Sequence, residues 1–149
     1  MNVTDRPHSP TLATRPHLPH RRVWQAVILL LALIPTTTSS ITLALGARRF
    51  VDAADVDVAF DNTYRYLGGV YLGIALLALW CVPRIEERVQ ALLFVAGAIF
   101  LGGVGRLVSI ADVGTPSGIT WALIGIEMGV LFLTLALRRS IQPAPVLAD

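Results

Sequence analysis

The hydrophobic and polar positions of this chain alternate on the length scale of a membrane-spanning helix. Four long apolar segments occupy residues 23–45, 64–82, 89–110 and 119–137, and polar connections separate them. About 20 mostly apolar residues are needed for a helix to cross the hydrocarbon core of a bilayer. The pattern therefore predicts an all-α, integral membrane four-helix bundle.

Two polar tails flank this bundle. Residues 1–22 are rich in proline and histidine and have no apolar period, so we expect a disordered tail, and a metal site at its histidines is not favoured. Residues 140–149 form a short C-terminal tail. A cleaved secretory signal is the alternative interpretation of the first apolar segment.

Proline interrupts the first apolar segment. Pro35 is followed directly by three threonines and two serines. A proline removes one helix hydrogen bond and should kink the helix, and the neighbouring hydroxyls can satisfy the freed carbonyls inside a membrane.

Composition supports the membrane class. The 149 residues are 54% hydrophobic and 15% charged, with a mean hydropathy of +0.66, whereas a soluble domain carries about 25% charged residues. All the basic side chains are dispersed arginines and the net charge is only +2, which argues against a nucleic-acid partner. Cys81 is the single cysteine, so an intrachain disulfide is excluded.

Arginine counts predict the orientation. Both tails and the turn at residues 83–88 carry arginines, and only Arg48 and Arg49 lie in the connections on the other side. By the positive-inside rule, both termini should be cytoplasmic in a multi-pass protein of the inner (plasma) membrane. The connection at residues 46–63 alternates aspartates with apolar residues, which indicates an interfacial segment with a solvated acidic face; a calcium loop would need a turn glycine and a closing glutamate.

Three charged residues lie inside or at the edge of the apolar segments: Arg65, Arg106 and Glu127. An antiparallel hairpin of the second and third segments would place the two arginines level with each other. The next turn would place Glu127 about 6 Å deeper than Arg106, within reach of its side chain. We therefore expect one polar cluster near the outer leaflet, whose rim would include Asn62, Ser109 and Asp112.

Small residues should pack the helices below this cluster. The tetrapeptide Leu-Gly-Gly-Val occurs at residues 67–70 and 101–104. The same hairpin would set Gly68 against Gly103 and Gly69 against Gly102, with Gly73 extending the stripe. Such stripes allow close helix packing, either within the chain or in a homo-oligomer.

The cluster admits two interpretations. It is either a structural ion-pair network, or a net positive site, open to the outside, for an anionic headgroup, a carboxylate or a quinone-like acceptor. No histidine or cysteine lies near it, and the sequence contains no metal-ligand spacing or phosphate loop. The sequence therefore predicts no catalytic residue, no metal and no cofactor, and it does not favour an enzyme.

The motifs resemble a known family. The pattern Asn-x-x-Arg-x-x-Gly-Gly-x-x-x-Gly at 62–73, the pattern Phe-Leu-Gly-Gly-x-Gly-Arg-Leu-x-Ser at 100–109, Gly114-x-Pro116 and Glu127 are similar to those of a bacterial family of small four-span membrane proteins. It is the domain-of-unknown-function family 4345. The resemblance covers about residues 23–137 and implies the four-helix architecture without implying an activity.

Two functions are compatible with this pattern. The first is a non-enzymatic binding or accessory module that holds an anionic membrane lipid or a partner helix at Arg65, Arg106 and Glu127. The second is a small oligomeric transporter or membrane redox component that handles a small anion or a quinone.

Overall fold

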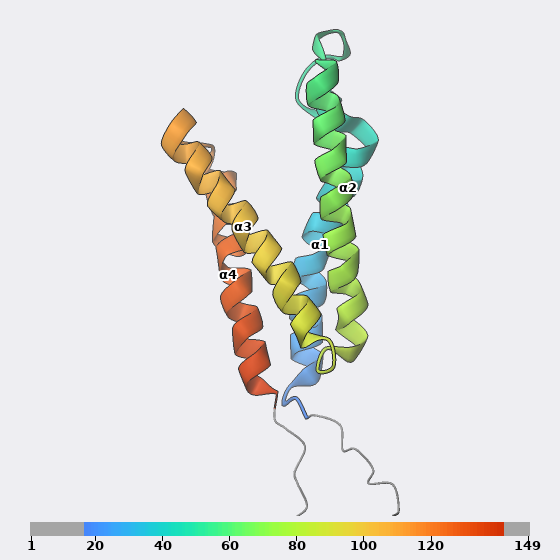
Figure 1. Ribbon diagram of the computed structural model, residues 1–149, viewed down its shortest axis with the longest axis vertical. Helices are drawn as coiled ribbons and strands as arrows, with labels where there is room; N and C mark the ends of the chain where they lie inside the picture. The colour runs from blue at the N-terminus through green and yellow to red at the C-terminus, as the bar shows by residue number, and fades with distance from the viewer. Residues whose placement is uncertain (1–16, 142–149) are drawn as a thin grey trace, which may run out of the picture.

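The computed structural model describes residues 17–141, in which helices are joined by short turns and loops (Figure 1). Each of its four α-helices is long and apolar enough to cross a membrane. This confirms the predicted all-α class and the number of such helices. The helices are α1 (Arg21–Leu45), α2 (Val58–Cys81), α3 (Val89–Val113) and α4 (Gly118–Ser140), and short 3₁₀ turns occupy Gly46–Arg49, Ala53–Asp55 and Val82–Arg84.

Helix α2 begins earlier than the hydropathy pattern predicts. Its first residue is Val58 rather than Tyr64, because Asp57 caps the helix by accepting a hydrogen bond from the backbone N–H of Phe60 at 2.7 Å. Asp61 then lies in the first turn, where a carboxylate is favourable. The connection expected over residues 46–63 is therefore shorter. Helix α3 likewise continues beyond residue 110 to Val113.

Helix α1 continues through its proline. Pro35 lies inside an unbroken helix. The hydroxyls of Thr36, Thr38 and Thr42 each donate to a carbonyl one turn earlier, at 2.7, 3.0 and 2.9 Å, so these three threonines satisfy their hydroxyls within the helix.

The four helices form two hairpins that part from each other. Helices α1 and α2 lie side by side along their length, as do α3 and α4 (Figure 1). The two hairpins meet at the end where the described chain starts and stops, which we call the closed end. They splay apart toward the opposite, open end, where the α1–α2 and α3–α4 connections lie (Figure 1).

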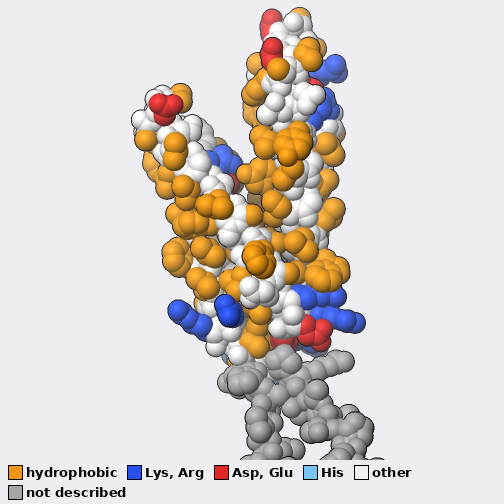
Figure 2. Space-filling view, viewed as in Figure 1, with side chains coloured by type: hydrophobic (Ala, Val, Ile, Leu, Met, Phe, Trp, Pro, Cys, Tyr) orange, Lys and Arg blue, Asp and Glu red, His pale blue; other side chains and the backbone are white. Residues whose placement is uncertain are grey.

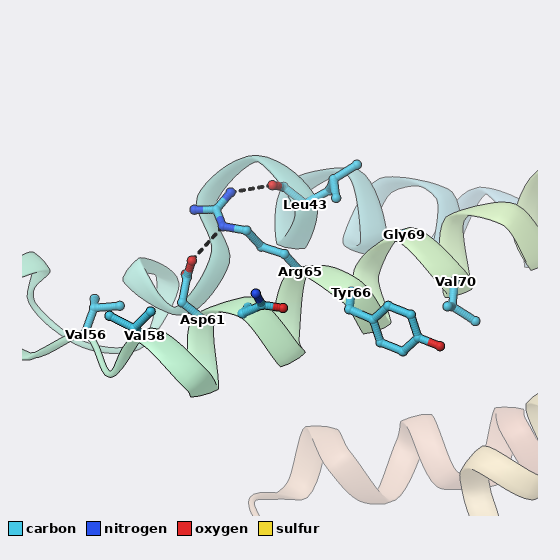
Figure 3. Close-up of a pocket in the computed structure, with 9 residues that line it drawn as sticks. Leu43, Val56, Val58, Asp61, Arg65, Tyr66, Gly69 and Val70 are labelled. Atoms are coloured by element: carbon cyan, nitrogen blue, oxygen red, sulfur yellow. Dashed lines mark hydrogen bonds and ion pairs between the residues drawn. The ribbon is translucent and has the colours of Figure 1, made fainter.

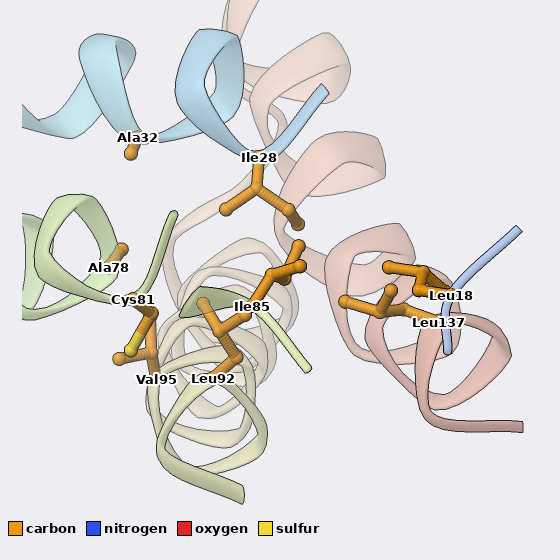
Figure 4. Packing of buried hydrophobic residues seen from close by; sticks show 9 residues of the cluster. All are labelled: Leu18, Ile28, Ala32, Ala78, Cys81, Ile85, Leu92, Val95 and Leu137. Atoms are coloured by element: carbon orange, nitrogen blue, oxygen red, sulfur yellow. The ribbon is translucent and has the colours of Figure 1, made fainter. Parts of the chain in front are cut away.

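The hydrophobic core lies at the closed end, where all four helices and the segment before α1 contribute (Figure 4). Ile85, in the α2–α3 turn, and Leu137 are fully buried. Leu18 packs into the same cluster and is 4% exposed. The expectation that residues 1–22 form one disordered tail is therefore wrong for residues 17–22. The rest of that tail and residues 142–149 lie outside the described part.

The helix surface is strongly apolar. Large hydrophobic side chains are exposed along both hairpins, for example Phe94, Leu101 and Phe132, each more than 60% exposed. Figure 2 shows them covering both hairpins, with basic and acidic groups at the ends of the hairpins and where the two hairpins separate. A contiguous apolar surface of this extent is typical of a membrane protein.

Candidate functional site

The first arginine of the apolar helices, Arg65, connects α2 to the end of α1. The Nε atom of Arg65 donates to Asp61 at 2.8 Å, and Nη1 donates to the carbonyls of Leu43 and Ala44 at 2.6 and 3.0 Å. Figure 3 shows the Arg65 side chain directed toward α1. These carbonyls belong to the last turn of α1, which lacks helical partners. Arg65 therefore caps α1 from the neighbouring helix.

A glycine makes room for this cap. Gly46 has φ of 59°, and a Cβ atom there would collide with the carboxylate of Asp61 and come within 2.7 Å of the guanidinium of Arg65. The carboxylate of Asp61 also accepts a hydrogen bond from the backbone N–H of Ala47 at 2.7 Å. Backbone turn, carboxylate and arginine thus form one hydrogen-bonded unit, which we call the α1 cap.

The second arginine of the apolar helices, Arg106, forms an ion pair between the two helices of the other hairpin. The Nε atom of Arg106 on α3 lies 3.1 and 2.9 Å from the two carboxylate oxygens of Glu127 on α4. The side chain of Arg106 is 44% exposed and that of Glu127 is 19% exposed. Close helix approach permits this pair, because a Cβ atom on Gly103 would lie only 3.2 Å from the Cβ atom of Glu127.

Glu127 also lines a cavity between the two hairpins. This cavity, which we call the slot, has a volume of about 110 Å³. Its walls come from all four helices, over residues 28–35, 71–78, 92–99 and 123–134. Apart from Tyr71, Glu127 and Thr134, the lining side chains are apolar. Thr134 satisfies its hydroxyl on the carbonyl of Val130 at 2.8 Å, so the polar groups left to a ligand are those of Tyr71 and Glu127.

Tyr71 on α2 contacts α3 of the other hairpin, near the Arg106–Glu127 ion pair. Its hydroxyl lies 3.2 Å from the position that a Cβ atom on Gly102 would take. Gly102 is four residues before Arg106 on α3, and therefore lies about one turn away on the same helix face. Tyr71 and Glu127 lie on the open-end side of Ala78 and Thr134. The slot thus has Tyr71 and Glu127 at a polar rim toward the open end, and a mostly apolar floor toward the closed end, where Thr134 has its hydroxyl bonded within α4.

The structure divides the cluster that the sequence suggested. Arg106 and Glu127 form the expected ion pair, whereas Arg65 pairs with Asp61 and points to α1. The depth of a residue along a helix follows from its number, but the direction of its side chain depends on which helices pack. Because α2 packs chiefly on α1 and α3 chiefly on α4, the two arginines serve different partners.

The glycine stripe is divided in the same way. Gly68 packs against Thr42 and Leu43 of α1, and Gly103 packs against Glu127 and Met128 of α4. The expected pairing of Gly68 with Gly103 and of Gly69 with Gly102 is therefore wrong. Gly69 and Gly73 face open space, because a Cβ atom added at either position would meet no atom within 4 Å among the described residues.

The expected rim residues lie apart from the ion pair. Asn62 lines a separate open groove of about 790 Å³, together with Arg65 and Tyr66. Ser109 and Asp112 are exposed on α3 and make no side-chain hydrogen bond within the described residues. In residues 17–141, no group of three or more His, Cys, Asp or Glu is placed to hold a metal ion.

Two residues of these sites are missed by sequence reasoning. The acidic pattern of residues 46–63 makes Asp61 one of several solvated aspartates, although its position four residues before Arg65 is the spacing of a helical ion pair. Tyr71 resembles an interfacial anchor or a packing residue, and nothing in the sequence indicates that its hydroxyl meets α3.

One family model matches most of the chain. The chain belongs to the family described as a domain of unknown function (DUF4345), whose model matches residues 23–138. No curated protein and no solved structure shows significant similarity to the chain. The matched region contains both arginine pairs and the whole lining of the slot.

Proposed function

We propose that this DUF4345 member is a non-enzymatic binding module, inserted in the inner (plasma) membrane with both termini in the cytoplasm. It holds an amphiphilic membrane molecule between its hairpins. The apolar chain of the ligand occupies the slot, and its polar head lies at the rim formed by Tyr71, Arg106 and Glu127. The observation that carries this proposal is the presence of Glu127 in the wall of a mostly apolar cavity lined by all four helices.

The location of a carboxylate there supports binding rather than packing alone. A carboxylate on a membrane helix is costly and marks a functional site by default. Glu127 forms an ion pair with Arg106 and also borders the cavity between the hairpins. The ion pair alone would not require that second position. A small pocket with few polar groups at one end is the usual form of a site for a mostly apolar ligand.

The slot dimensions support a single chain. Its walls follow each of α1, α2 and α3 for about two turns, which corresponds to about 10 Å along a helix. A volume of about 110 Å³ over that length leaves a narrow passage. One acyl or isoprenoid segment fits such a passage better than a ring system or a pair of chains.

Filling the slot should remove the ligand. Val130 lines the slot between Glu127 and Thr134, and Val130→Phe would occupy the space of the chain. Val108→Phe is the matched control, because Val108 is 63% exposed on α3 and does not line the slot. We expect native mass spectrometry of detergent-purified protein to show a bound amphiphile in the wild type and in Val108→Phe but not in Val130→Phe. Equal retention by both folded variants would contradict the proposal.

A further inference from the structure

We infer that the head of the bound molecule is an uncharged hydroxyl group, as in an alcohol, rather than an acid. This inference rests on the proposed function, since it concerns the ligand of the same slot. It goes against the anionic ligand that the sequence suggested, and its basis is the charge balance that the structure creates around the rim.

The rim carries no surplus charge. The net positive site expected from the sequence needed both Arg65 and Arg106 to lie beside the single carboxylate of Glu127. In the structure, Arg65 pairs with a different carboxylate, that of Asp61. Arg106 and Glu127 compensate each other directly at 2.9 Å. An anion placed beside this pair is attracted by one member and repelled by the other. Its desolvation in an apolar slot is unfavourable, and the balanced pair does not offset that cost.

The unused hydrogen-bonding groups at the rim suit a neutral head. The Nε atom of Arg106 is engaged by Glu127, while its two Nη groups make no hydrogen bond within residues 17–141 and stay available as donors. Glu127 retains acceptor capacity on its two oxygens, and the Tyr71 hydroxyl both donates and accepts. An alcohol can accept from Arg106 and donate to Glu127 at the same time, whereas an ionised acid has no proton for Glu127.

Two photoactivatable probes with one saturated chain separate these possibilities: a dodecanol and a dodecyl sulfonate, which stays ionised. Each is incorporated with the full-length protein in vesicles of uncharged phosphatidylcholine, and the labelled peptides are counted. We expect the alcohol to label α3 and α4 about tenfold more than the sulfonate in the wild type. Labelling within the slot should disappear in Val130→Phe and persist in Val108→Phe.

A charge substitution should reverse the preference. Glu127→Gln leaves Arg106 without its carboxylate and gives the rim a net positive charge, so the sulfonate should become the better probe. Asp112→Asn is the control, because it removes the same charge from an exposed position of α3 and should leave the preference unchanged. The double variant Arg106→Gln with Glu127→Gln restores neutrality and should again prefer the alcohol, which covers the case in which the single variant does not fold.

The outcomes distinguish the two proposals. Equal or stronger labelling of the wild-type slot by the sulfonate would overturn the uncharged head while leaving a binding slot. Labelling of the wild type by either probe that is insensitive to Val130→Phe would overturn the proposed function itself.

Discussion

Each of the two hairpins of this protein has an arginine inside an apolar helix, and the two arginines make different contacts. In each hairpin the arginine lies three residues from a glycine of a Leu-Gly-Gly-Val sequence. Arg65 is 34% exposed and makes bonds to a carboxylate and to two backbone carbonyls. Arg106 is 44% exposed, and within the described residues its Nε atom alone is engaged, by Glu127.

The difference lies in what each guanidinium leaves unused. Arg65 directs its donors to the end of α1, where unpaired carbonyls would otherwise lie in an apolar setting, so its role is structural. The two Nη groups of Arg106 make no hydrogen bond within residues 17–141, and its partner Glu127 lines the slot. An intramembrane arginine is therefore a candidate site only after its backbone partners have been accounted for.

The largest loss of stability is expected from Gly46→Ala. The residue would be strained at φ of 59°, at a cost of about 1–3 kcal/mol, and its Cβ atom would also displace Asp61 and Arg65. Gly114→Ala is the matched control, since Gly114 has φ of 118° but open space around it within the described residues. Thermal unfolding in detergent should show a larger drop in Tm for Gly46→Ala. A drop no larger than that of Gly114→Ala would show that the α1 cap contributes little.

Arg65→Gln should have the next largest effect. The substitution leaves the carbonyls of Leu43 and Ala44 without their charged donor, and we expect a loss of about 1–2 kcal/mol in the free energy of unfolding. Hydrogen exchange should increase first in the last turn of α1. Arg65→Lys should recover only part of the stability, because one ammonium cannot reproduce the planar fork of the guanidinium. Unchanged exchange in α1 would contradict the capping role.

The two arginines also show which features of this structure can be predicted from the sequence and which cannot. Hydropathy predicts four helices because the apolar segments are long and uninterrupted, and residue depth along the helices pairs Arg106 with Glu127. The early start of α2 depends on the Asp57 cap, which lies outside the apolar pattern. The partner of Arg65 depends on which helix lies beside α2, and hydropathy contains no information on helix neighbours. The slot likewise requires the angle between the hairpins.

Gly103→Ala should have a smaller effect on stability and a clear one on the slot. Its Cβ atom would lie 3.1 Å from the sulfur of Met128 and 3.2 Å from the Cβ atom of Glu127, so α4 must shift by a few tenths of an ångström. We expect a loss of about 1 kcal/mol and reduced ligand retention in native mass spectrometry. Gly105→Ala is the control, because a Cβ atom there meets nothing within 4 Å among the described residues. Identical behaviour of both variants would contradict close α3–α4 packing at the rim.

The smallest loss of stability is expected from Arg106→Gln, although this variant should be impaired in binding. A half-exposed ion pair contributes at most about 1 kcal/mol, and Arg106 supports no backbone carbonyl within residues 17–141. The Tm should therefore stay close to that of the wild type and above that of Arg65→Gln. Retention of the amphiphile should fall, since the head loses both Nη donors. If Arg106→Gln instead unfolds as readily as Arg65→Gln while the ligand is retained, both arginines are structural and the rim is not a binding site.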